Sequence, residues 1–374
     1  MLVTPVVRKS SCRAGATLTL AAIALLGGCS RSQQRPRDPA QVRAQIVRLL
    51  PARIPDRNGW ATDITAAFAA LNIEPTTSNL CATLAITEQE SNFSSDPVVP
   101  NLPRIALAEI DRRAGQHDVP QFLVHAALLF KSPNGKRYDE RIAAVRTEQD
   151  MSRIYEDFMG SVPLGKRLFA GDNPIRTGGP MQVSVDFAEQ RSRAYPYPVA
   201  GSIRHEVFTR RGGVYFGIAH LLGYPVSYPQ MVYRFADYNA GFYASRNAAF
   251  QRAVSIASGI PIPLDGDLVG YGRDRNRIGT TEVAVRSLAR SLDMSDGQIH
   301  RALQDGETAR LEDSNLYQGV FKLAEHLQHR ALPRATLPRI TLESPKITRK
   351  LTTAWFATRV DQRYRRCMAK ATGS

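Results

Sequence analysis

One acidic side chain stands on the apolar face of a predicted helix. Residues 79–93 read NLCATLAITEQESNF, and at 100° per residue Glu90 falls between Ile86 and Phe93. Glu88 falls on the opposite, solvated side. Burial disfavours an ionised carboxylate, so we expect Glu90 to hold a proton near neutral pH, as a general acid requires. The alternative is a slightly rotated helix in which Glu90 is an ordinary carboxylate at the edge of the core.

A polar residue is also predicted to turn inward on a later helix. Residues 230–240, QMVYRFADYNA, have an apolar face that includes Tyr238, and Asn239 lies beside it. A buried amide needs a hydrogen-bond partner, so Asn239 is a candidate site residue. His220, in a segment that is apolar nearly all round, is interpreted as a core histidine rather than a ligand or a base.

The sequence does not predict a metal or a cofactor. Its histidines show no HExxH or similar ligand spacing, and neither a Gly-rich phosphate loop nor a Ser-His-Asp order stands out. The carboxylates considered as a second catalytic acid are Glu88, Asp186, Glu189 and Asp237. None of them is favoured, and Asp237 is expected to fall off the inward face of its helix.

Residues 1–28 have the pattern of an export signal. Arg8, Lys9 and Arg13 precede an apolar run over 16–26, and small residues follow. The sequence Leu-Gly-Gly-Cys at 26–29 resembles the lipobox of bacterial lipoproteins, which implies cleavage before Cys29 and lipidation of its thiol. Ser30, rather than Asp, follows it, which favours an outer-membrane anchor facing the periplasm. The alternative is an ordinary export signal with a free Cys29.

Two cysteines remain in the oxidising compartment that this signal predicts. We expect Cys81 and Cys367 to form a disulfide that ties the C-terminal tail to the polar side of the 79–93 helix, opposite Glu90. The alternative is a pair of buried free thiols. The formal net charge of +15 favours anionic lipid head groups or the carboxylates of peptidoglycan stem peptides as partners, unless it is simply a solvated surface. Because the signal predicts export, nucleic acid is not expected as a partner. Protein partners are not predicted.

Helical periodicity dominates the chain, and strand alternation with hairpin turns is scarce, so we predict a mainly α fold. A polar tether covers 29–40, and a Gly- and Pro-rich break at 259–272 marks a domain boundary. Outside the N-terminus no apolar run is long enough to span a bilayer. Helices are predicted at 39–50, 60–71, 79–93, 105–114, 121–130, 151–159, 183–194, 212–222, 230–240, 248–257, 282–292, 296–304, 315–327 and 348–369.

Three short motifs occur in an order that resembles a known family. Glu90-Ser91-Asn92-Phe93, Gly179-Pro180-Met181-Gln182 and Tyr238-Asn239-Ala240-Gly241 are similar to the ES-x-F, G-L-M-Q and Y-N-A-G motifs of lysozyme-like lytic transglycosylases. The apolar segment before the third motif is also similar to the apolar helix that precedes the same motif in that family. The resemblance covers 60–257, and the whole chain resembles a family of Gram-negative lipoproteins. It implies a lysozyme-like catalytic domain over 41–258 with an insertion at about 94–177, followed by a helical extension over 259–374.

The resemblance implies cleavage of the bond between N-acetylmuramic acid and N-acetylglucosamine in peptidoglycan strands, with a 1,6-anhydro product. Glu90 would be both acid and base, and Ser91 would support it. Met181 and Gln182 would line the saccharide groove, and Tyr238 with Asn239 would position the substrate or Glu90. Hydrolases usually need a second carboxylate, whereas here the substrate's own hydroxyl attacks.

Two departures from the family pattern leave other functions open. Pro180 replaces the usual Leu, and the long insertion between Glu90 and Met181 could form a lid, a specificity wall or a barrier across the groove. Arg146, Glu148 and Asp150 within it either rebuild part of the site or are surface residues. One alternative function is a lysozyme-fold lipoprotein that binds peptidoglycan or an envelope partner without cutting it. Another is a true hydrolase with an unrecognised second carboxylate.

Overall fold

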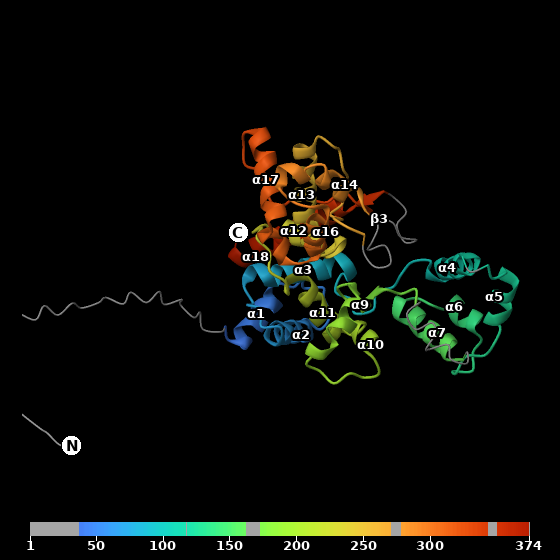
Figure 1. Ribbon diagram of the computed structural model, residues 1–374. Coiled ribbons are helices and arrows are strands. Elements are labelled where there is room, and N and C mark those ends of the chain that lie inside the picture. Colours follow the sequence, from blue (N-terminus) through green and yellow to red (C-terminus); the bar gives the residue numbers. More distant parts are fainter. Residues whose placement is uncertain (1–36, 117, 162–172, 271–277, 343–349, 374) are drawn as a thin grey trace, which may run out of the picture. The chain divides into compact units, whose positions relative to one another are not determined.

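The fold is mainly α, as predicted. The computed structural model describes residues 37–116, 118–161, 173–270, 278–342 and 350–373, so Cys29 and the export signal lie outside it. The α-helices (Figure 1) are α1 Pro39–Leu49, α2 Arg57–Ala70, α3 Thr77–Ser91, α4 Leu102–Gln116, α5 Gln121–Leu128, α6 Tyr138–Ala143, α7 Glu148–Ser161, α9 Val185–Gln190, α10 Ile203–Val207, α11 Arg210–Leu222, α12 Met231–Ala240, α13 Ala244–Ser258, α14 Thr280–Arg286, α15 Ala289–Leu292, α16 Asp296–Leu303, α17 Asn315–Gln328 and α18 Thr353–Thr372.

Short strands and 3₁₀ turns complete the described elements. Strands β1 Thr177–Gly178 and β2 Val183–Ser184 pair antiparallel, as do β3 Thr341–Leu342 and β4 Leu351–Thr352. The 3₁₀ turns are Ser192–Ala194, Gln304–Glu307 and Ala309–Asp313. Within these described residues, no helix combines the length and the apolar character needed to cross a membrane.

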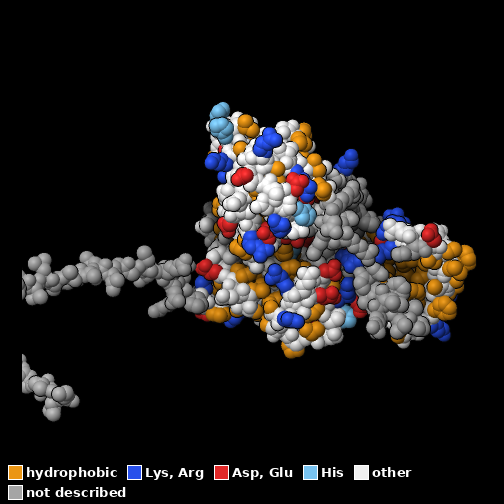
Figure 2. Space-filling view, in the orientation of Figure 1, with side chains coloured by type: hydrophobic (Ala, Val, Ile, Leu, Met, Phe, Trp, Pro, Cys, Tyr) orange, Lys and Arg blue, Asp and Glu red, His pale blue; other side chains and the backbone are white. Residues whose placement is uncertain are grey.

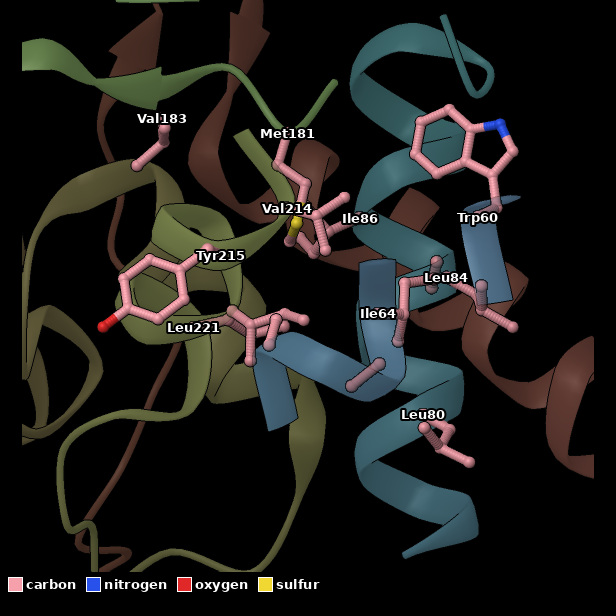
Figure 3. Close-up of a cluster of buried hydrophobic side chains, with 14 of the residues drawn as sticks. Trp60, Ile64, Leu80, Leu84, Ile86, Met181, Val183, Val214, Tyr215 and Leu221 are labelled. Atoms are coloured by element: carbon pink, nitrogen blue, oxygen red, sulfur yellow. The ribbon is translucent and has the colours of Figure 1, made fainter. Parts of the chain in front are cut away.

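Helix α3 lies inside the largest hydrophobic core. Helices α11 and α18 both pack against it, so its residues from Leu80 to Thr87 are buried on every side (Figure 3). Helix α18 contributes Phe356 and Val360 to this core. The last helix of the predicted C-terminal extension is therefore part of the same core as the predicted catalytic domain.

The predicted disulfide between Cys81 and Cys367 is confirmed, with their Cα atoms 5.5 Å apart. The prediction that it sits on a polar side of α3 is wrong, because Cys81 is fully buried under α18. A single helix seen in sequence cannot reveal that a segment nearly three hundred residues later covers its apparently polar side.

A second core joins α13 to the helices that follow it. Phe250 and Val254 of α13 pack with Val285 of α14, Ile299 of α16 and Phe321 of α17. This core therefore crosses the predicted boundary at 258/259, because one face of α13 belongs to it. Helix α16 begins with the capping box that the Ser-x-x-Gln sequence at 295–298 predicts: Ser295 and Gln298 are bonded to each other's backbone N–H groups.

The insertion has a small core of its own. Helices α4, α6 and α7 meet through a third cluster that includes Leu102, Tyr138 and Ile154. Two polar contacts join it to α10: the His205 imidazole lies 2.8 Å from a Glu156 carboxylate oxygen, and Arg204 donates a 2.7 Å hydrogen bond to the Ile175 carbonyl.

The segment 177–184 is a hairpin where part of a helix was predicted. Thr177 pairs with Ser184 and Gly178 with Val183, so helical structure starts only at Val185. Gly179 has φ +72°, and a Cβ there would lie 2.0 Å from the Val207 carbonyl oxygen. Glycine is required at this turn both by its left-handed backbone and by the close approach of another chain segment.

Gly179→Ala is expected to lower the free energy of unfolding by about 2–3 kcal/mol, since it adds a steric clash to left-handed strain. Gly259→Ala is the matched control, because Gly259 has φ +71° with no atom within 4 Å of its would-be Cβ. The control should lose only about 1 kcal/mol. Urea unfolding of the two variants measures the difference, and equal losses would show that the contact with Val207 contributes nothing.

Candidate functional site

Glu90 lies in the last turn of α3 and is half-buried. The helix stops just beyond it because Asn92 and Phe93 take left-handed conformations, with φ 51° and 63°. The Phe93 ring then packs edge-on against Trp60, with the ring centres 5.5 Å apart. This contact fixes where the helix ends and therefore where the Glu90 carboxyl group is presented.

Ser91 has a local role in α3. Its hydroxyl donates a 3.1 Å hydrogen bond to the Thr87 carbonyl, and Thr87 in turn donates to Thr83 at 2.9 Å. This ladder satisfies buried hydroxyls within the helix. Ser91 thus bonds within the helix that carries Glu90, and the role that the resemblance implies for it stays a prediction.

Tyr238 connects the third motif to the second and feels the charge of the first. Its hydroxyl donates a 2.7 Å hydrogen bond to the Met181 carbonyl oxygen, so α12 is fixed to the hairpin. Burial and the negative charge of Glu90 raise the pKa of Tyr238 well above its ordinary value. The structure therefore brings Glu90, Met181 and Tyr238 together, although they are far apart in the sequence.

The Met181 side chain lies in the core, not on an open groove wall. It is fully buried and points toward Ile86 and Val214 (Figure 3). A Cβ on Gly217 would come within 2.4 Å of its sulfur, so that glycine makes room for it on α11. Met181 acts by anchoring the hairpin, and its backbone carbonyl rather than its side chain meets Tyr238.

The Gln182 amide is turned back onto its own hairpin. It donates to the Gly179 carbonyl at 3.3 Å and accepts from the Thr177 hydroxyl at 3.4 Å. The side chain remains half-buried, and its backbone is left-handed with φ 50°. Gln182 thus stabilises the turn that presents Met181, and its amide group is already bonded.

Asn239 and Asp237 occupy the reverse of their predicted positions. Asn239 is exposed, with its amide oxygen 3.1 Å from the Thr353 hydroxyl, whereas Asp237 is fully buried. The Asp237 carboxylate accepts hydrogen bonds from the Tyr228 hydroxyl and, at 2.7 Å, from the Ser245 backbone N–H. Helix α13 folds back after Gly241 and buries the side of α12 that the pattern marked as solvated.

Two tyrosines that the sequence analysis did not single out complete this buried site. Tyr224 and Tyr228 both donate to Asp237, whose pKa is raised by burial. Their four-residue spacing before α12 was the available signal. The arrangement satisfies a buried carboxylate and holds α12, and with it Tyr238, in place.

The other candidate carboxylates are engaged elsewhere or exposed. Glu88 lies 3.8 Å from Arg53 and 3.6 Å from Arg366, and Asp186 lies 3.8 Å from Arg176. Glu189 is exposed. Across the described ranges, no group of three His, Cys, Asp or Glu side chains is arranged to hold a metal ion.

His220 is a core histidine, as predicted. Its Nε2–H donates to the Tyr238 carbonyl at 3.3 Å, and the rings of Phe187, Tyr238 and Phe242 surround it with centres 4.8 Å away. Burial lowers the pKa of His220 from 6.5 to about 4. Its Nδ1 is buried and has no hydrogen-bond partner in the described part of the chain.

Acid is therefore expected to weaken the fold through His220. The unfolded chain takes up a proton near pH 6.5 and the folded one only near pH 4, so stability falls as pH drops through that window. The expected loss is about 2 kcal/mol, reduced from the full linkage value because the ring keeps some exposure. Urea unfolding at pH 7 and pH 4.5 measures it: His220→Phe should lose less stability than the wild type, while the exposed His125→Gln should match it.

The chain belongs to the family described as "Protein of unknown function (DUF1615)", whose model matches residues 53–370. A relative from Escherichia coli (strain K12), described as "Uncharacterized protein YaiW", is 51% identical over 356 residues, covering 94% of this chain and 97% of its own length. No solved structure matches the chain. The whole-chain resemblance inferred from the sequence is thus confirmed at the level of this family.

Proposed function

We propose that the chain is a peptidoglycan lytic transglycosylase, with a lysozyme-like domain over 41–258 and Glu90 as its general acid and base. The observation that supports the proposal is a chain of contacts between the three motifs. Tyr238 is bonded to the Met181 carbonyl at 2.7 Å, and the charge of Glu90 acts on that same tyrosine. The Met181 side chain points toward Ile86, one turn before Glu90 on α3 (Figure 3).

In the proposed reaction, protonated Glu90 gives its proton to the glycosidic oxygen as that oxygen leaves C1 of N-acetylmuramic acid. The ionised carboxylate then accepts the proton of the same sugar's 6-hydroxyl, whose oxygen bonds to C1 and closes the 1,6-anhydro ring. One C–O bond breaks, one forms, and no water is consumed. Tyr238 is a positioning residue: its protonated hydroxyl donates to the Met181 carbonyl and so holds the hairpin to α12.

A second candidate is a lipoprotein that binds peptidoglycan or an envelope partner without cutting it. Three observations favour it: the Met181 side chain is buried, the Gln182 amide is bonded within its own turn, and Asn239 is bonded to Thr353. These residues would be expected to face sugar in a cutting enzyme. Without Arg8, Lys9 and Arg13 of the predicted signal the formal net charge is (49 − 3) − 34 = +12, which suits binding to the anionic stem peptides in either case.

Digestion of purified sacculi with residues 30–374 separates the functions. Mass analysis of the released material would show anhydro-ended muropeptides for a transglycosylase and reducing ends for a hydrolase. Sacculi that sediment the protein but release no fragments would support the binding lipoprotein. Release of reducing ends alone, or the lack of any release, would overturn the first proposal.

The proposed location is the periplasmic face of the outer membrane, with a lipid on Cys29. In cells, Cys29→Ala is expected to move the protein from the membrane fraction to the soluble periplasm, since the lipid supplies the membrane affinity. Cys12→Ala is the matched control, because that cysteine lies in the predicted signal and should leave fractionation unchanged. Membrane sedimentation of Cys29→Ala at wild-type levels would contradict the anchor.

A further inference from the structure

A cavity of about 1460 Å³ lies within the insertion, lined by described residues of α4, α5, α6 and α7 and of 174–177. Most of its lining side chains are apolar, including Ile110, Val124 and Phe158. Val119 also lines it and is 40% exposed, so the cavity opens to solvent there. Pockets that hold small molecules usually measure about 300–1,000 Å³ and have such apolar walls.

Arginines outnumber acids among the charged side chains that line the cavity. These side chains are Arg112, Arg113 and Arg176 against Glu109 and the buried Glu148. Glu109 lies 2.7 Å from each of the two neighbouring guanidinium groups, and the hydrogen bonds from them hold the pKa of Glu109 at about 2. Its carboxylate stays ionised and offsets one charge of that arginine pair. The side chain of Arg112 remains 53% exposed. That of Arg176 is 50% exposed and lies 3.8 Å from the exposed Asp186 carboxylate, an ion pair that solvent screens and that leaves the guanidinium accessible to a further anion.

Helix α5 and the two residues after it leave apolar side chains uncovered. Phe122 and Phe130 are each 71% exposed, and Leu123 and Leu129 are 50% and 53% exposed. Figure 2 shows these hydrophobic side chains gathered over the place that Figure 1 labels α5. An exposed apolar patch of this kind marks contact with another apolar surface. Val124 and Leu128 of the same helix line the cavity, so α5 carries both the exposed patch and part of the cavity wall.

We propose that the insertion binds a long-chain amphiphile with an anionic head group. The acyl chain occupies the cavity, the head group lies against Arg112 and Arg176, and the exposed face of α5 meets the apolar surface from which the ligand comes. A free fatty acid and a single-chain anionic phospholipid share this chemistry. The proposal does not depend on transglycosylase activity, because every residue that it uses lies in the insertion or immediately after it.

Calorimetric titration of residues 30–374 with dodecanoate, and with dodecanoyl lysophosphatidylglycerol, tests the proposal. We expect saturable binding of one molecule per chain, with dodecan-1-ol and dodecyltrimethylammonium binding at least tenfold more weakly. Binding of dodecanoate alone would identify a free fatty acid as the ligand, and binding of both anions a membrane lipid. Failure of both anions to bind would overturn the proposal, as would equal affinity for the cationic amphiphile.

Matched variants locate the site. Val124→Trp fills the cavity and is expected to weaken dodecanoate binding at least tenfold, whereas Leu107→Trp, on an exposed position of α4 outside the lining, should leave it unchanged. Ile110→Trp is a second cavity-filling variant in case the first does not fold. Arg176→Gln should weaken dodecanoate several-fold, and Arg104→Gln, outside the lining, should not. Unchanged binding in a folded cavity-filling variant would place the amphiphile on the surface of α5 and overturn the proposal.

Discussion

Glu90→Gln is expected to lower the release of anhydro-ended muropeptides from sacculi about 10³-fold, the usual range for losing a general acid. The amide keeps the size of the side chain but can neither donate a proton to the leaving oxygen nor accept one from the 6-hydroxyl. Circular dichroism and urea unfolding should match the wild type, because only the protonation chemistry of one half-buried side chain changes.

Glu88→Gln is the matched control for that experiment. Glu88 lies on the same turn of α3, but its carboxylate faces Arg53 at 3.8 Å and Arg366 at 3.6 Å. Losing this carboxylate should leave product release within about twofold of the wild type, since ion pairs with such exposed arginines contribute little to stability. If both variants cut sacculi like the wild type, Glu90 is not the acid. If Glu88→Gln loses product release and Glu90→Gln does not, the catalytic carboxylate has been assigned to the wrong residue.

Cys367→Ser is expected to lower the free energy of unfolding by about 3–5 kcal/mol, the upper part of the range for native disulfides. The bond closes a loop with a sequence separation of 286 residues. Removing it therefore increases the conformational entropy of the unfolded chain more than removing a bond across a short loop would. Because it ties α18 to α3, the loss should appear first as detachment of the C-terminal helix. Hydrogen exchange would show this as faster exchange in α18 than in α13.

The control for this prediction is chemical reduction. A reducing agent should lower the wild-type urea midpoint toward that of Cys367→Ser and leave the variant itself unchanged. Cys81 is fully buried and remains as a small apolar side chain in the variant, so the variant tests the bond rather than a new buried polar group. Equal midpoints for the oxidised wild type and the variant would mean that core contacts of α18, such as Phe356, hold the helix alone.

Local patterns were enough to predict most helices. Apolar periodicity located the helix from Met231 to Ala240, and a glycine marked its end: Gly241 is the C-cap, with φ 112°. The same local chemistry placed the capping box at Ser295. These features depend on residues within one or two turns of each other, so the sequence contains all the information they need.

Pairing across the chain was predictable only where chemistry left one choice. With Cys12 in the predicted signal and Cys29 at the predicted lipobox, Cys81 and Cys367 had only each other in the oxidising compartment that the signal predicts. The hairpin at Thr177–Ser184 had no comparable signal, because its strands are two residues long and too short to show alternation. Its position depends on Tyr238 and Val207, which reach it from later elements.

The sequence by itself determined a mainly α chain, the disulfide partners and the order of the three motifs. Only the tertiary structure decided which side of each helix is buried. Asp237 lies inside and Asn239 outside because α13 folds back over α12, and Cys81 is buried because α18 lies on α3. Helical periodicity gives the relative directions of side chains, but burial depends on neighbours distant in the sequence, and those neighbours come together only in the folded chain.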